Sequence, residues 1–564
     1  MERIKSIWYN HQNPELWSAE YPEGSMYGYL SETAKKHLNS CAIEFEGKKL
    51  TYKELLQQID NVARCLQSIG IKKEDRVSII SANIPQAIVS IYAINKTGAI
   101  ANLIHPLLSA NEIENIIKNT ESSAIIILDM IYPKIKNISW DKEKKPKIIL
   151  ARIADALPLP IKPIYLLKNK LNIELNPAHD IISWKNFISI KKEELYENSN
   201  DNTSDDTAII MYSGGTTGIP KGVMLTNMNF NSFAVQAYDV NGIADLTGKK
   251  SLALLPFFHG FGFGTGIHST LCSGLHIYLV PKFDFIKSTN LIFRKKINCL
   301  YAVPALYEAI LRSPQIEKQN ISFFLNLISG GDKLSEKLYN KLDKHLKNSN
   351  SSTVFCDGYG QTECVSGCIT NPYFAVNPKS VGILQPDMSA KIVEPGTHNE
   401  VPNGTDGELC INGPTVMKGY YKNEEETKKA LQLHEDGKIW LHTGDMFSRD
   451  DDGYFYFKQR ISRMAISAGY NIYVTEIEKV INSCPIVAQS CVVGVKDKVL
   501  GQRIVAHVVL NNADADKNKI KAIINEKCRA SLAEYSLPHE IRFKKELPMT
   551  NLGKINFKAL EEEK

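Results

Sequence analysis

The sequence lacks long apolar runs and any segment that resembles a targeting signal. Its best apolar stretch, Ala124 to Leu128, has five residues, whereas a helix that crosses a bilayer needs about 18. The first ten residues carry charges but no unbroken apolar segment after them, so they do not resemble a secretory signal. We therefore expect a cytoplasmic protein without membrane-spanning helices, and a peripheral membrane contact stays open.

A strong charge excess and a cysteine framework are also missing. The formal charge of +5 over 564 residues is too dilute to indicate a nucleic-acid partner, so we expect none. None of the 11 cysteines has CxxC spacing, and the nearest pair, Cys364 and Cys368, would offer a metal only two thiolates. We expect reduced, buried cysteines, as is usual in cytosolic proteins.

Helical and strand patterns alternate along most of the chain. An amphipathic pattern from Tyr52 to Leu66 precedes the apolar segment Val77 to Ile80, and a second alternation runs from about Asn227 to Thr353. This alternation predicts parallel sheets covered by helices on both faces. The stretch from Tyr132 to Ser204, rich in Lys, Asn and Pro, is predicted to be irregular. The last hundred residues mix strands with a helix over Lys517 to Leu532 and predict a separate small α+β unit.

A glycine-rich segment follows the apolar stretch Ala208-Ile-Ile-Met. It runs Tyr212-Ser-Gly-Gly-Thr-Thr-Gly-Ile-Pro-Lys-Gly-Val223. Its glycines, hydroxyls and lysine suit a loop whose backbone amides wrap around phosphate oxygens. It is not a Walker loop, because Lys221 lies between Pro220 and Gly222. A flexible linker is the alternative, but a linker has no reason to follow a buried strand.

This loop resembles the phosphate loop of the adenylate-forming superfamily, which contains acyl-CoA synthetases, luciferases and adenylation domains. Four further segments match motifs of that family in the same order. They are Gly358-Tyr-Gly-Gln-Thr-Glu363, His442-Thr-Gly-Asp445, Gln459-Arg460 with Gly469-Tyr-Asn and Glu476-Ile-Glu478, and Leu547-Pro-Met-Thr-Asn-Leu-Gly-Lys-Ile555. Each motif alone is weak, but five in order over nearly the whole chain are specific.

The resemblance implies an α/β fold with a large N-terminal domain and a small C-terminal one. The N-terminal domain would contain two doubly wound α/β subdomains plus a small β-barrel-like subdomain, and the C-terminal domain would be a mobile α+β unit. The implied boundaries are residues 1–459 for the domain that binds AMP and the acid, 460–462 for a hinge, and 463–564 for the lid.

The resemblance also implies a role for individual residues. The phosphates of ATP would be held by Ser213, Gly214, Gly215, Thr217, Gly218 and Lys221. The adenine side would be formed by Gly330, Gly331, Asp332, Tyr359, Gly360, Gln361 and Thr362. Asp445 would accept the ribose hydroxyls, with Arg460 also on the nucleotide, and Gly469 and Tyr470 would line the path of the pantetheine thiol.

Four residues are implied to be catalytic: Lys554, His259, Thr216 and Glu363. Thr216 and Glu363 would also hold Mg2+, a hard cation that prefers oxygen ligands. Taken singly, Asp445 has the alternative of a turn aspartate, Glu363 that of a solvated helix carboxylate, and His259 that of a core histidine. The glycines and phenylalanines around His259 suit the close approach of a long apolar ligand, or simply a packed core.

Three departures from the family pattern concern the hinge, the phosphate loop and the C-terminal motif. Ser462 and Arg463 stand where Asp or Lys and then an acidic residue are common, which puts the detailed hinge contacts in doubt. The phosphate loop begins with Tyr212 rather than Ser or Thr. Three residues after Lys554, where an arginine is frequent, the chain has Phe557. None of these changes removes a group that the chemistry requires.

The resemblance thus implies an ATP- and Mg2+-dependent acid–thiol ligase. It would convert a carboxylic acid, most readily a medium- or long-chain fatty acid, to acyl-AMP with release of pyrophosphate, and then transfer the acyl group to CoA. The alternatives within the family are an aryl, bile or other acid–CoA ligase, or an acyl-AMP ligase that loads an acyl carrier protein. Outside it, a catalytically silent nucleotide-binding scaffold is the alternative. Attack of a carboxylate on a triphosphate brings like charges together, so positive charge and orientation are the main demands on the protein.

Overall fold

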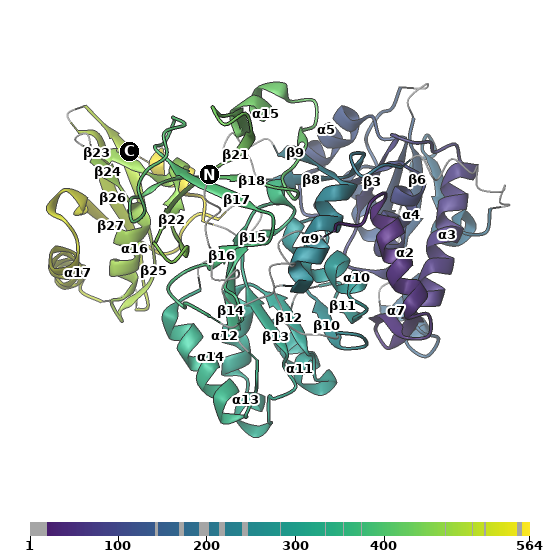
Figure 1. Cartoon of the computed structure of the whole chain (residues 1–564), viewed down its shortest axis with the longest axis horizontal. Helices are drawn as coiled ribbons and strands as arrows, with labels where there is room; N and C mark the ends of the chain where they lie inside the picture. Colours follow the sequence, from purple (N-terminus) through teal and green to yellow (C-terminus); the bar gives the residue numbers. More distant parts are fainter. Residues whose placement is uncertain are drawn as a thin grey trace. The chain divides into compact units, whose positions relative to one another are not determined.

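The computed structural model describes residues 20–563, except 142–144, 169–173, 191–201, 214–219, 240–245, 283, 333, 354, 374, 468–469, 499, 513–514 and 550–554. Contacts between Cα atoms divide the chain into two compact units. The first holds Met1–Ala390, Ile411–Leu441 and Asp451–Phe455, and the second holds Lys391–Cys410, His442–Asp450 and Tyr456–Lys564. Figure 1 shows the elements of each unit coloured along the chain.

The first unit contains an eight-stranded sheet in the order β19-β9-β8-β4-β3-β5-β6-β7. Neighbours from β8 to β7 are parallel, whereas β9 pairs antiparallel with both β8 and β19. The strands are β3 (Arg76–Ile80), β4 (Ile100–Leu103), β5 (Ala124–Leu128), β6 (Lys147–Ala151), β7 (Asp180–Ser183), β8 (Thr207–Ser213), β9 (Lys221–Thr226) and β19 (Gly419–Tyr420). The helices of this region are α3 (Tyr52–Ser68), α4 (Pro85–Lys96), α5 (Ala110–Thr120), η2 (Asp129–Lys134), α6 (Ile153–Ala156), α7 (Lys162–Lys168), α8 (Trp184–Phe187), α9 (Asn227–Asp239) and α15 (Glu424–Ala430).

A nine-stranded sheet of the same unit has the order β16-β15-β14-β13-β12-β10-β11-β1-β2. The strands are β1 (Cys41–Phe45), β2 (Lys48–Thr51), β10 (Lys250–Ala253), β11 (His276–Leu279), β12 (Cys299–Ala302), β13 (Asn326–Ser329), β14 (Phe355–Gly360), β15 (Gly367–Thr370) and β16 (Ile383–Leu384). Its helices are α2 (Met26–Lys36), the π-helix η5 (Phe261–Ser269), α10 (Thr270–Cys272), α11 (Phe285–Lys295), α12 (Pro304–Arg312), α13 (Gln315–Lys318), α14 (Glu336–Asn348) and the 3-10 helix η6 (Thr362–Cys364). The helices α11, α12 and α14 contact one another in turn (Figure 1).

Local sequence explains why these elements form where they do, as α3 illustrates. The Thr51 side chain accepts a hydrogen bond from the Glu54 amide, and the Glu54 carboxylate accepts one from the Thr51 amide, so two amides at the helix start that lack a partner within the helix are satisfied. Leu55, Ile59 and Val62 then repeat at helical spacing and are buried. Burial of this stripe against the sheet is what stabilises the helix.

The second unit is built around a sheet in the order β24-β23-β26-β25, with β27 beside β26. The elements are η7 (Ile461–Arg463), β23 (Ala465–Ser467), β24 (Tyr470–Ile472), α16 (Val474–Asn482), β25 (Val487–Asp497), β26 (Gly501–Leu510), α17 (Lys517–Ser531), η8 (Glu534–Ser536), β27 (Glu540–Lys544) and α18 (Phe557–Glu561). Ile477, Val492, Ile504 and Ile524 join these helices and strands in one buried cluster.

A further sheet has the order β17-β18-β21-β20, with β22 beside β21. Its strands are β17 (Ser389–Val393), β18 (Gly407–Asn412), β20 (Leu431–Leu433), β21 (Ile439–Arg449) and β22 (Phe455–Arg460).

The predicted α/β class, with a large N-terminal unit and a small C-terminal one, is confirmed. The prediction that Tyr132 to Ser204 is irregular is wrong, because this stretch contributes β6, β7 and several helical turns. These elements are only four to seven residues long, too short to give a periodic signal. The implied boundaries at residues 459 and 462 stay a prediction.

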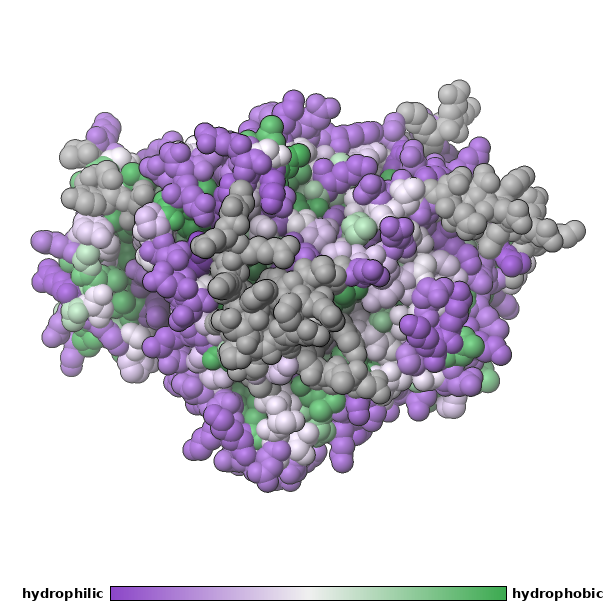
Figure 2. All heavy atoms as spheres, viewed as in Figure 1, coloured by the Kyte–Doolittle hydropathy of each residue, from purple (hydrophilic) through white to green (hydrophobic). Residues whose placement is uncertain are grey.

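The surface is largely hydrophilic on the face shown in Figure 2, where apolar side chains lie between polar ones. Within the described part of the chain, no helix is long and apolar enough to cross a membrane. All the cysteines except Cys41 are buried, as predicted.

Candidate active site

The phosphate-loop segment is framed by a tight hairpin. Strand β8 pairs antiparallel with β9, and the register sets Ser213 opposite Lys221. Ser213 and Lys221 therefore lie side by side at the two ends of the connection between them. The Tyr212 hydroxyl donates to Oδ1 of Asn102 at 2.8 Å, which anchors the end of β8 to β4. Gly214, Gly215, Thr216, Thr217 and Gly218 lie outside the described residues.

Glu363 is held next to this hairpin. It lies in η6, which contacts both β8 and β9, and its side chain is buried. The hydroxyl of Tyr420, in β19, donates to Oε1 of Glu363 at 3.0 Å, while the Met417 amide donates to the Glu363 carbonyl at 2.8 Å. Burial and the adjacent carboxylate raise the pKa of Tyr420, so its hydroxyl stays protonated and donating. Oε2 of Glu363 has no hydrogen-bond donor among the described residues.

Lys221 forms an ion pair with Glu426 of α15. Its amine also lies 5.1 Å from the centre of the Tyr420 ring, a cation–π contact. Hydrogen bonds from Lys221 and Lys429 lower the pKa of Glu426. The cation expected to meet phosphate is therefore paired with a carboxylate here.

The expected adenine-binding segments meet at the ends of neighbouring parallel strands. Strands β13 and β14 pair with Ser329 opposite Asp357, so Gly330 and Gly358 follow side by side. A Cβ at Gly330 would lie 3.3 Å from the Phe261 ring and 3.6 Å from the Gly358 carbonyl oxygen. Clefts at the carboxyl ends of parallel strands are the usual ligand sites of such sheets. Gly331 has a φ of +79° and, with the exposed Asp332, continues this edge.

Tyr359 and Gly360 end β14, and Gln361 and Thr362 lead into η6. Gly360 is sterically required, because a Cβ there would lie 1.7 Å from the Ser366 carbonyl oxygen. Tyr359, Gln361 and Thr362 are half-buried. The buried Nε2 of Gln361 has no acceptor among the described residues. This donor is available for a ligand that presents oxygen or ring nitrogen.

The segment that carries His259 packs directly on the segment that carries Glu363. A Cβ on Gly260 would lie 1.7 Å from the Val365 carbonyl oxygen, and one on Gly264 would lie 2.8 Å from the Val365 side chain. Val365 has a φ of +66°, a conformation that a β-branched residue rarely adopts. The glycines expected to admit a ligand are thus needed, at these positions, for contact between two parts of the chain.

His259 is half-buried among aromatic rings. Its ring centre lies 5.0 Å from that of Phe258 and 5.6 Å from that of His105. Burial, reinforced by the positive charge of Lys134, lowers the pKa of His105 to about 4, so this neighbour is neutral at pH 7. Asn83 fixes the strand end before His259, since its Nδ2 donates to the carbonyls of Ala253 and Leu255 and its Oδ1 accepts from the Phe257 amide.

The second unit brings Asp445 and Arg460 together. Asp445 lies in β21 with a side chain only 4% exposed, and its Oδ1 is 3.5 Å from Nε of Arg460, which is 62% exposed. The turn before Asp445 is held by Glu408, which accepts from the Gly444 amide at 3.0 Å and lies 3.0 Å from Nδ1 of His442. Gly444 takes a φ of +70°, which suits glycine.

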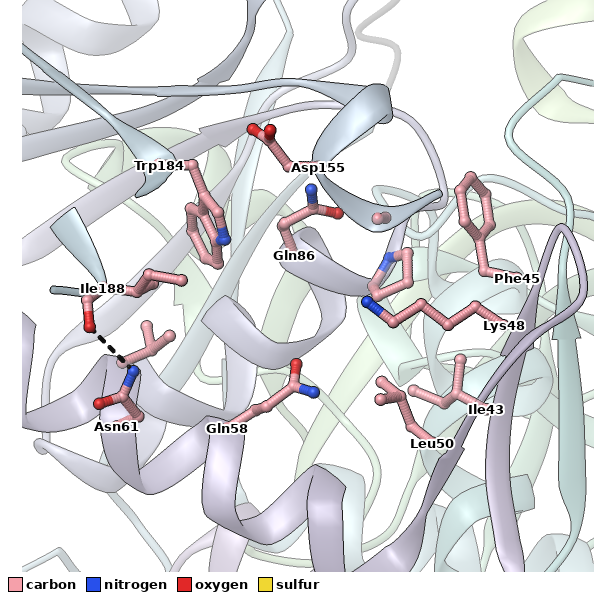
Figure 3. Close-up of a pocket in the computed structure, with 13 residues that line it drawn as sticks. Ile43, Phe45, Lys48, Leu50, Gln58, Asn61, Gln86, Asp155, Trp184 and Ile188 are labelled. Atoms are coloured by element: carbon pink, nitrogen blue, oxygen red, sulfur yellow. Dashed lines mark hydrogen bonds between the residues drawn. The ribbon is translucent and has the colours of Figure 1, made fainter. Parts of the chain in front are cut away.

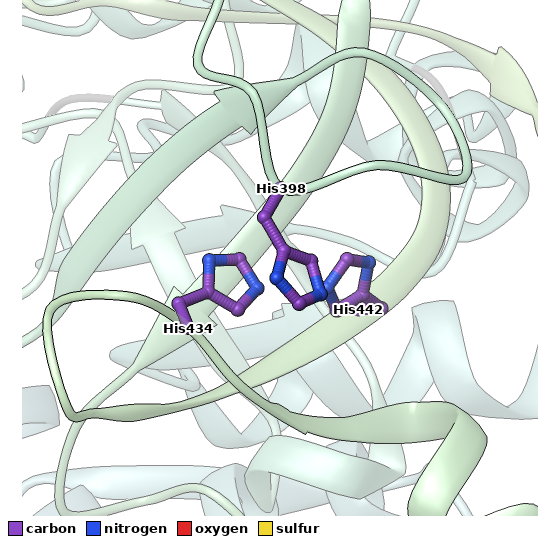
Figure 4. Close-up of side chains that lie close together, drawn as sticks. All are labelled: His398, His434 and His442. Carbon is purple, nitrogen blue, oxygen red and sulfur yellow. The ribbon is translucent and has the colours of Figure 1, made fainter.

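His398 lies beside His442 on this side of the turn, with ring centres 5.8 Å apart (Figure 4). Glu408, Cys410 and His442 also offer ligand atoms within 4.8 Å of one another. Both Glu408 oxygens already accept a hydrogen bond or contact His442, so these residues hold the turn in place, and we do not infer a metal site from them.

Two of the departures from the family pattern contact each other. Nη2 of Arg463 donates to Oε1 of Glu478 at 2.6 Å and to the Val492 carbonyl at 3.0 Å. The Arg463 guanidinium also lies 5.1 Å from the centre of the Phe557 ring. Arg463 therefore ties the region after β22 to the start of α18. Gly469 and Lys554 lie outside the described residues, as does the side chain of Tyr470, whose backbone begins β24.

A cavity of about 290 Å³ in the first unit contains none of the predicted site residues. Figure 3 shows it between the β1–β2 hairpin, α3, the start of α4 and α8, with Gln86, Trp184 and Lys48 around it.

Two protein-family models match this chain, one over its larger N-terminal part and one over its C-terminal part. The model of the AMP-binding enzyme family matches residues 30–421, and that of the AMP-binding enzyme C-terminal domain matches residues 476–554. The chain belongs to the AMP-binding enzyme family. This is the superfamily of AMP-forming acid–CoA ligases, for which ATP and CoA are substrates.

The relatives cover most of the chain. It is 32% identical to a long-chain-fatty-acid–CoA ligase of Bacillus subtilis over 98% of both chains. It is 30% identical to a probable 4-coumarate–CoA ligase of Dictyostelium discoideum over 80% of both chains. The ATP-bound crystal structure of MatB from Rhodopseudomonas palustris is similar with a TM-score of 0.81, at 25% identity, over 95% of this chain and 98% of that chain.

Several residues that contact the site were not predicted from the sequence. Tyr420, Glu426, His105 and Asn83 lie outside the quoted motifs, and each reaches a site residue or its segment only through the fold. The sole sequence signal was the run Lys418-Gly-Tyr-Tyr421, whose glycine and aromatics suggest a structured turn.

Proposed function

We propose that this protein activates a medium- or long-chain fatty acid with ATP and transfers it to CoA. The carboxylate attacks the α-phosphate of ATP, which releases pyrophosphate and forms acyl-AMP. The CoA thiol then attacks the acyl carbon and releases AMP. The observation that carries the fatty-acid assignment is the 32% identity over 98% of both chains with a long-chain-fatty-acid–CoA ligase.

The described residues suit the first step. Ser213 and Lys221 stand at the mouth of the glycine-rich loop, and Lys221 can exchange its pairing with Glu426 for phosphate oxygens. The free Nε2 of Gln361 and the Gly330–Gly358 edge offer a place for the adenine. Asp445, buried and acceptor-rich, suits the two ribose hydroxyls beside Arg460. We propose these as nucleotide contacts, with Gly331, Asp332, Tyr359, Gly360 and Thr362 completing the adenine side.

A magnesium ion fits the residues present. Glu363 is a buried carboxylate whose Oε2 has no donor among the described residues, and Tyr420 fixes its other oxygen. Glu363 and the hydroxyl of Thr216 would hold the ion, which when bound neutralises phosphate charge. Tyr420 contributes by keeping the Glu363 carboxylate in one orientation.

The acid would enter beside His259. This half-buried ring, next to the neutral His105 and Phe258, gives a polar atom at the edge of an apolar wall. Such a wall suits an alkyl chain better than a charged group. Lys554, on the C-terminal motif, is proposed to supply positive charge to the attacking carboxylate in the first step, with the Gly469–Tyr470 segment serving the thiol in the second.

The similarity to a probable 4-coumarate–CoA ligase favours an aryl acid as the second candidate. A panel of acids from short aliphatic through long-chain to aromatic, assayed for pyrophosphate release with and without CoA, separates the two. We expect the highest kcat/KM for a medium- or long-chain acid and acyl-CoA as the product. A preference for aromatic acids would move the assignment to the second candidate. Acyl-AMP that accumulates with CoA and disappears only with a carrier protein would contradict the CoA step.

A further inference from the structure

One short surface segment gathers more exposed apolar side chains than any other stretch of the described chain. Five large apolar residues within nine positions are each at least 40% exposed. They are Leu159 (83%), Ile161 (40%), Ile164 (57%), Leu166 (42%) and Leu167 (72%). Single exposed apolar residues are normal on protein surfaces, but a contiguous group marks an interaction site.

The charged residues of the segment itself have one sign. From Pro158 to Lys170 the sequence contains Lys162, Lys168 and Lys170 and no Asp or Glu. Acidic side chains face the segment from two neighbouring elements. Asp155 of α6 lies 3.9 Å from the amine of Lys162, and burial, together with the charge of Asp129 in η2, raises the pKa of Tyr165. Within its own sequence the segment places apolar residues between lysines.

The exposed side chains of this segment suit insertion into lipid better than binding in the groove of a partner protein. Residues Lys162–Lys168 form the short helix α7, which contacts α6. Ile164 and Leu167 are three residues apart and share a face, but Leu166 points to another face and is also exposed. A partner protein that binds a helix in a groove contacts a single stripe of its side chains. In α7 apolar side chains are exposed on more than one face, which suits a helix surrounded by lipid.

We propose that residues 159–168 dock this protein on a membrane surface that contains anionic lipid. The apolar side chains would enter the boundary between headgroups and acyl chains, while the positive charge that the lysines give this segment would be attracted to the lipid phosphates. The proposal concerns binding alone and does not depend on which acid the protein activates.

Sedimentation with lipid vesicles tests the proposal. The full-length protein is mixed with vesicles of equal parts phosphatidylglycerol and phosphatidylcholine, or of phosphatidylcholine alone. We expect binding to the first that weakens with salt. The double variant L159S/L167S should bind at least tenfold less, and K162Q/K168Q should lose the preference for phosphatidylglycerol.

A matched control is the double variant L433S/I439S, which replaces two apolar residues of similar exposure, 66% and 55%, on another part of the first unit. It should bind vesicles as the native protein does. Unchanged thermal unfolding and pyrophosphate release show that each variant is folded. The proposal is overturned if native protein stays in solution with both vesicle types, or if L159S/L167S binds as well as native protein. A concentration-dependent dimer that L159S/L167S abolishes, without vesicle binding, would assign the segment to self-association instead.

Discussion

The Tyr420 hydroxyl donates a hydrogen bond of 3.0 Å to Oε1 of Glu363, 57 residues earlier in the chain. Tyr420 reaches this position because β19 pairs with β9, where it lies opposite Val223. Strand β9 begins at Lys221, whose amine contacts the Tyr420 ring. One tyrosine thus contacts both the carboxylate proposed for magnesium and the lysine proposed for phosphate.

Replacing Tyr420 with phenylalanine should slow pyrophosphate release about tenfold, because a hydrogen bond to a charged group contributes roughly 1.5–3 kcal/mol. Glu363 would lose its fixed orientation, so the Mg2+ concentration for half-maximal activity should rise. Magnesium titrations of the rate measure both effects. Tyr421→Phe is the control, since the Tyr421 hydroxyl makes no hydrogen bond with any of the described residues. Equal effects in the two variants would contradict a specific role for Tyr420.

Removing the charge of Glu426 should tighten ATP binding. Glu426 competes with phosphate for Lys221, and a partly exposed ion pair contributes up to about 1 kcal/mol, so Glu426→Gln should lower the Kd of ATP roughly twofold to fivefold. Calorimetric titration with ATP measures this. Glu425→Gln is a matched control, because among the described residues Glu425 pairs with Lys429 and not with Lys221, and it is 81% exposed. Weaker ATP binding by Glu426→Gln would instead mean that Glu426 holds Lys221 in place.

Stability should fall as the pH drops from about 6.5 towards 4. Burial lowers the pKa of His105 to about 4 and that of the fully buried His268 to about 3. In this window the unfolded chain takes up protons that the folded chain does not, so protonation favours unfolding. The stabilising contribution of the neutral rings is complete above about 6.5 and is lost as the pH falls through the folded pKa values.

Thermal unfolding followed between pH 4 and 8 checks this prediction. On acidification the melting temperature of His105→Gln should fall less than that of the native protein, since the variant has one fewer group to protonate. An unchanged slope in His105→Gln would refute the assignment.

Arg463→Gln should destabilise the second unit and slow adenylation. Arg463 and Glu478 are 19% and 14% exposed, so removing the arginine leaves a largely buried carboxylate without its cation, at a cost of roughly 3–5 kcal/mol. It also frees the start of α18, three residues after Lys554. Proteolysis of the C-terminal part and the rate of pyrophosphate release measure the two effects. Arg312→Gln, which breaks an exposed pair with Glu308, should change neither.

The two half-reactions should separate in the C-terminal variants. Lys554→Ala should abolish formation of acyl-AMP while it spares thioester formation from supplied acyl-AMP, because the proposed charge of Lys554 serves the attacking carboxylate. Gly469→Leu should do the reverse by obstructing the thiol. Assays of each half-reaction measure the division, and equal loss of both in Lys554→Ala would rule it out.

Much of this site could be predicted from short stretches of sequence. Ser213, Lys221, Glu363 and Asp445 each sit in a motif whose residue types already indicate phosphate, metal or ribose chemistry. The α/β alternation was also visible, because helices such as α3 bury a periodic stripe. The elements between Tyr132 and Ser204 were missed, because strands of four or five residues leave no periodic trace.

What the sequence determined alone was the chemistry of each local segment and the family to which the segments belong. The tertiary structure decided which segments meet. Lys221 and Glu426 are 205 residues apart, and Arg463 and Phe557 both depart from the family pattern, yet each pair is in contact. Contacts of this kind follow from strand pairing and core packing, which depend on the whole fold, so no local pattern records them.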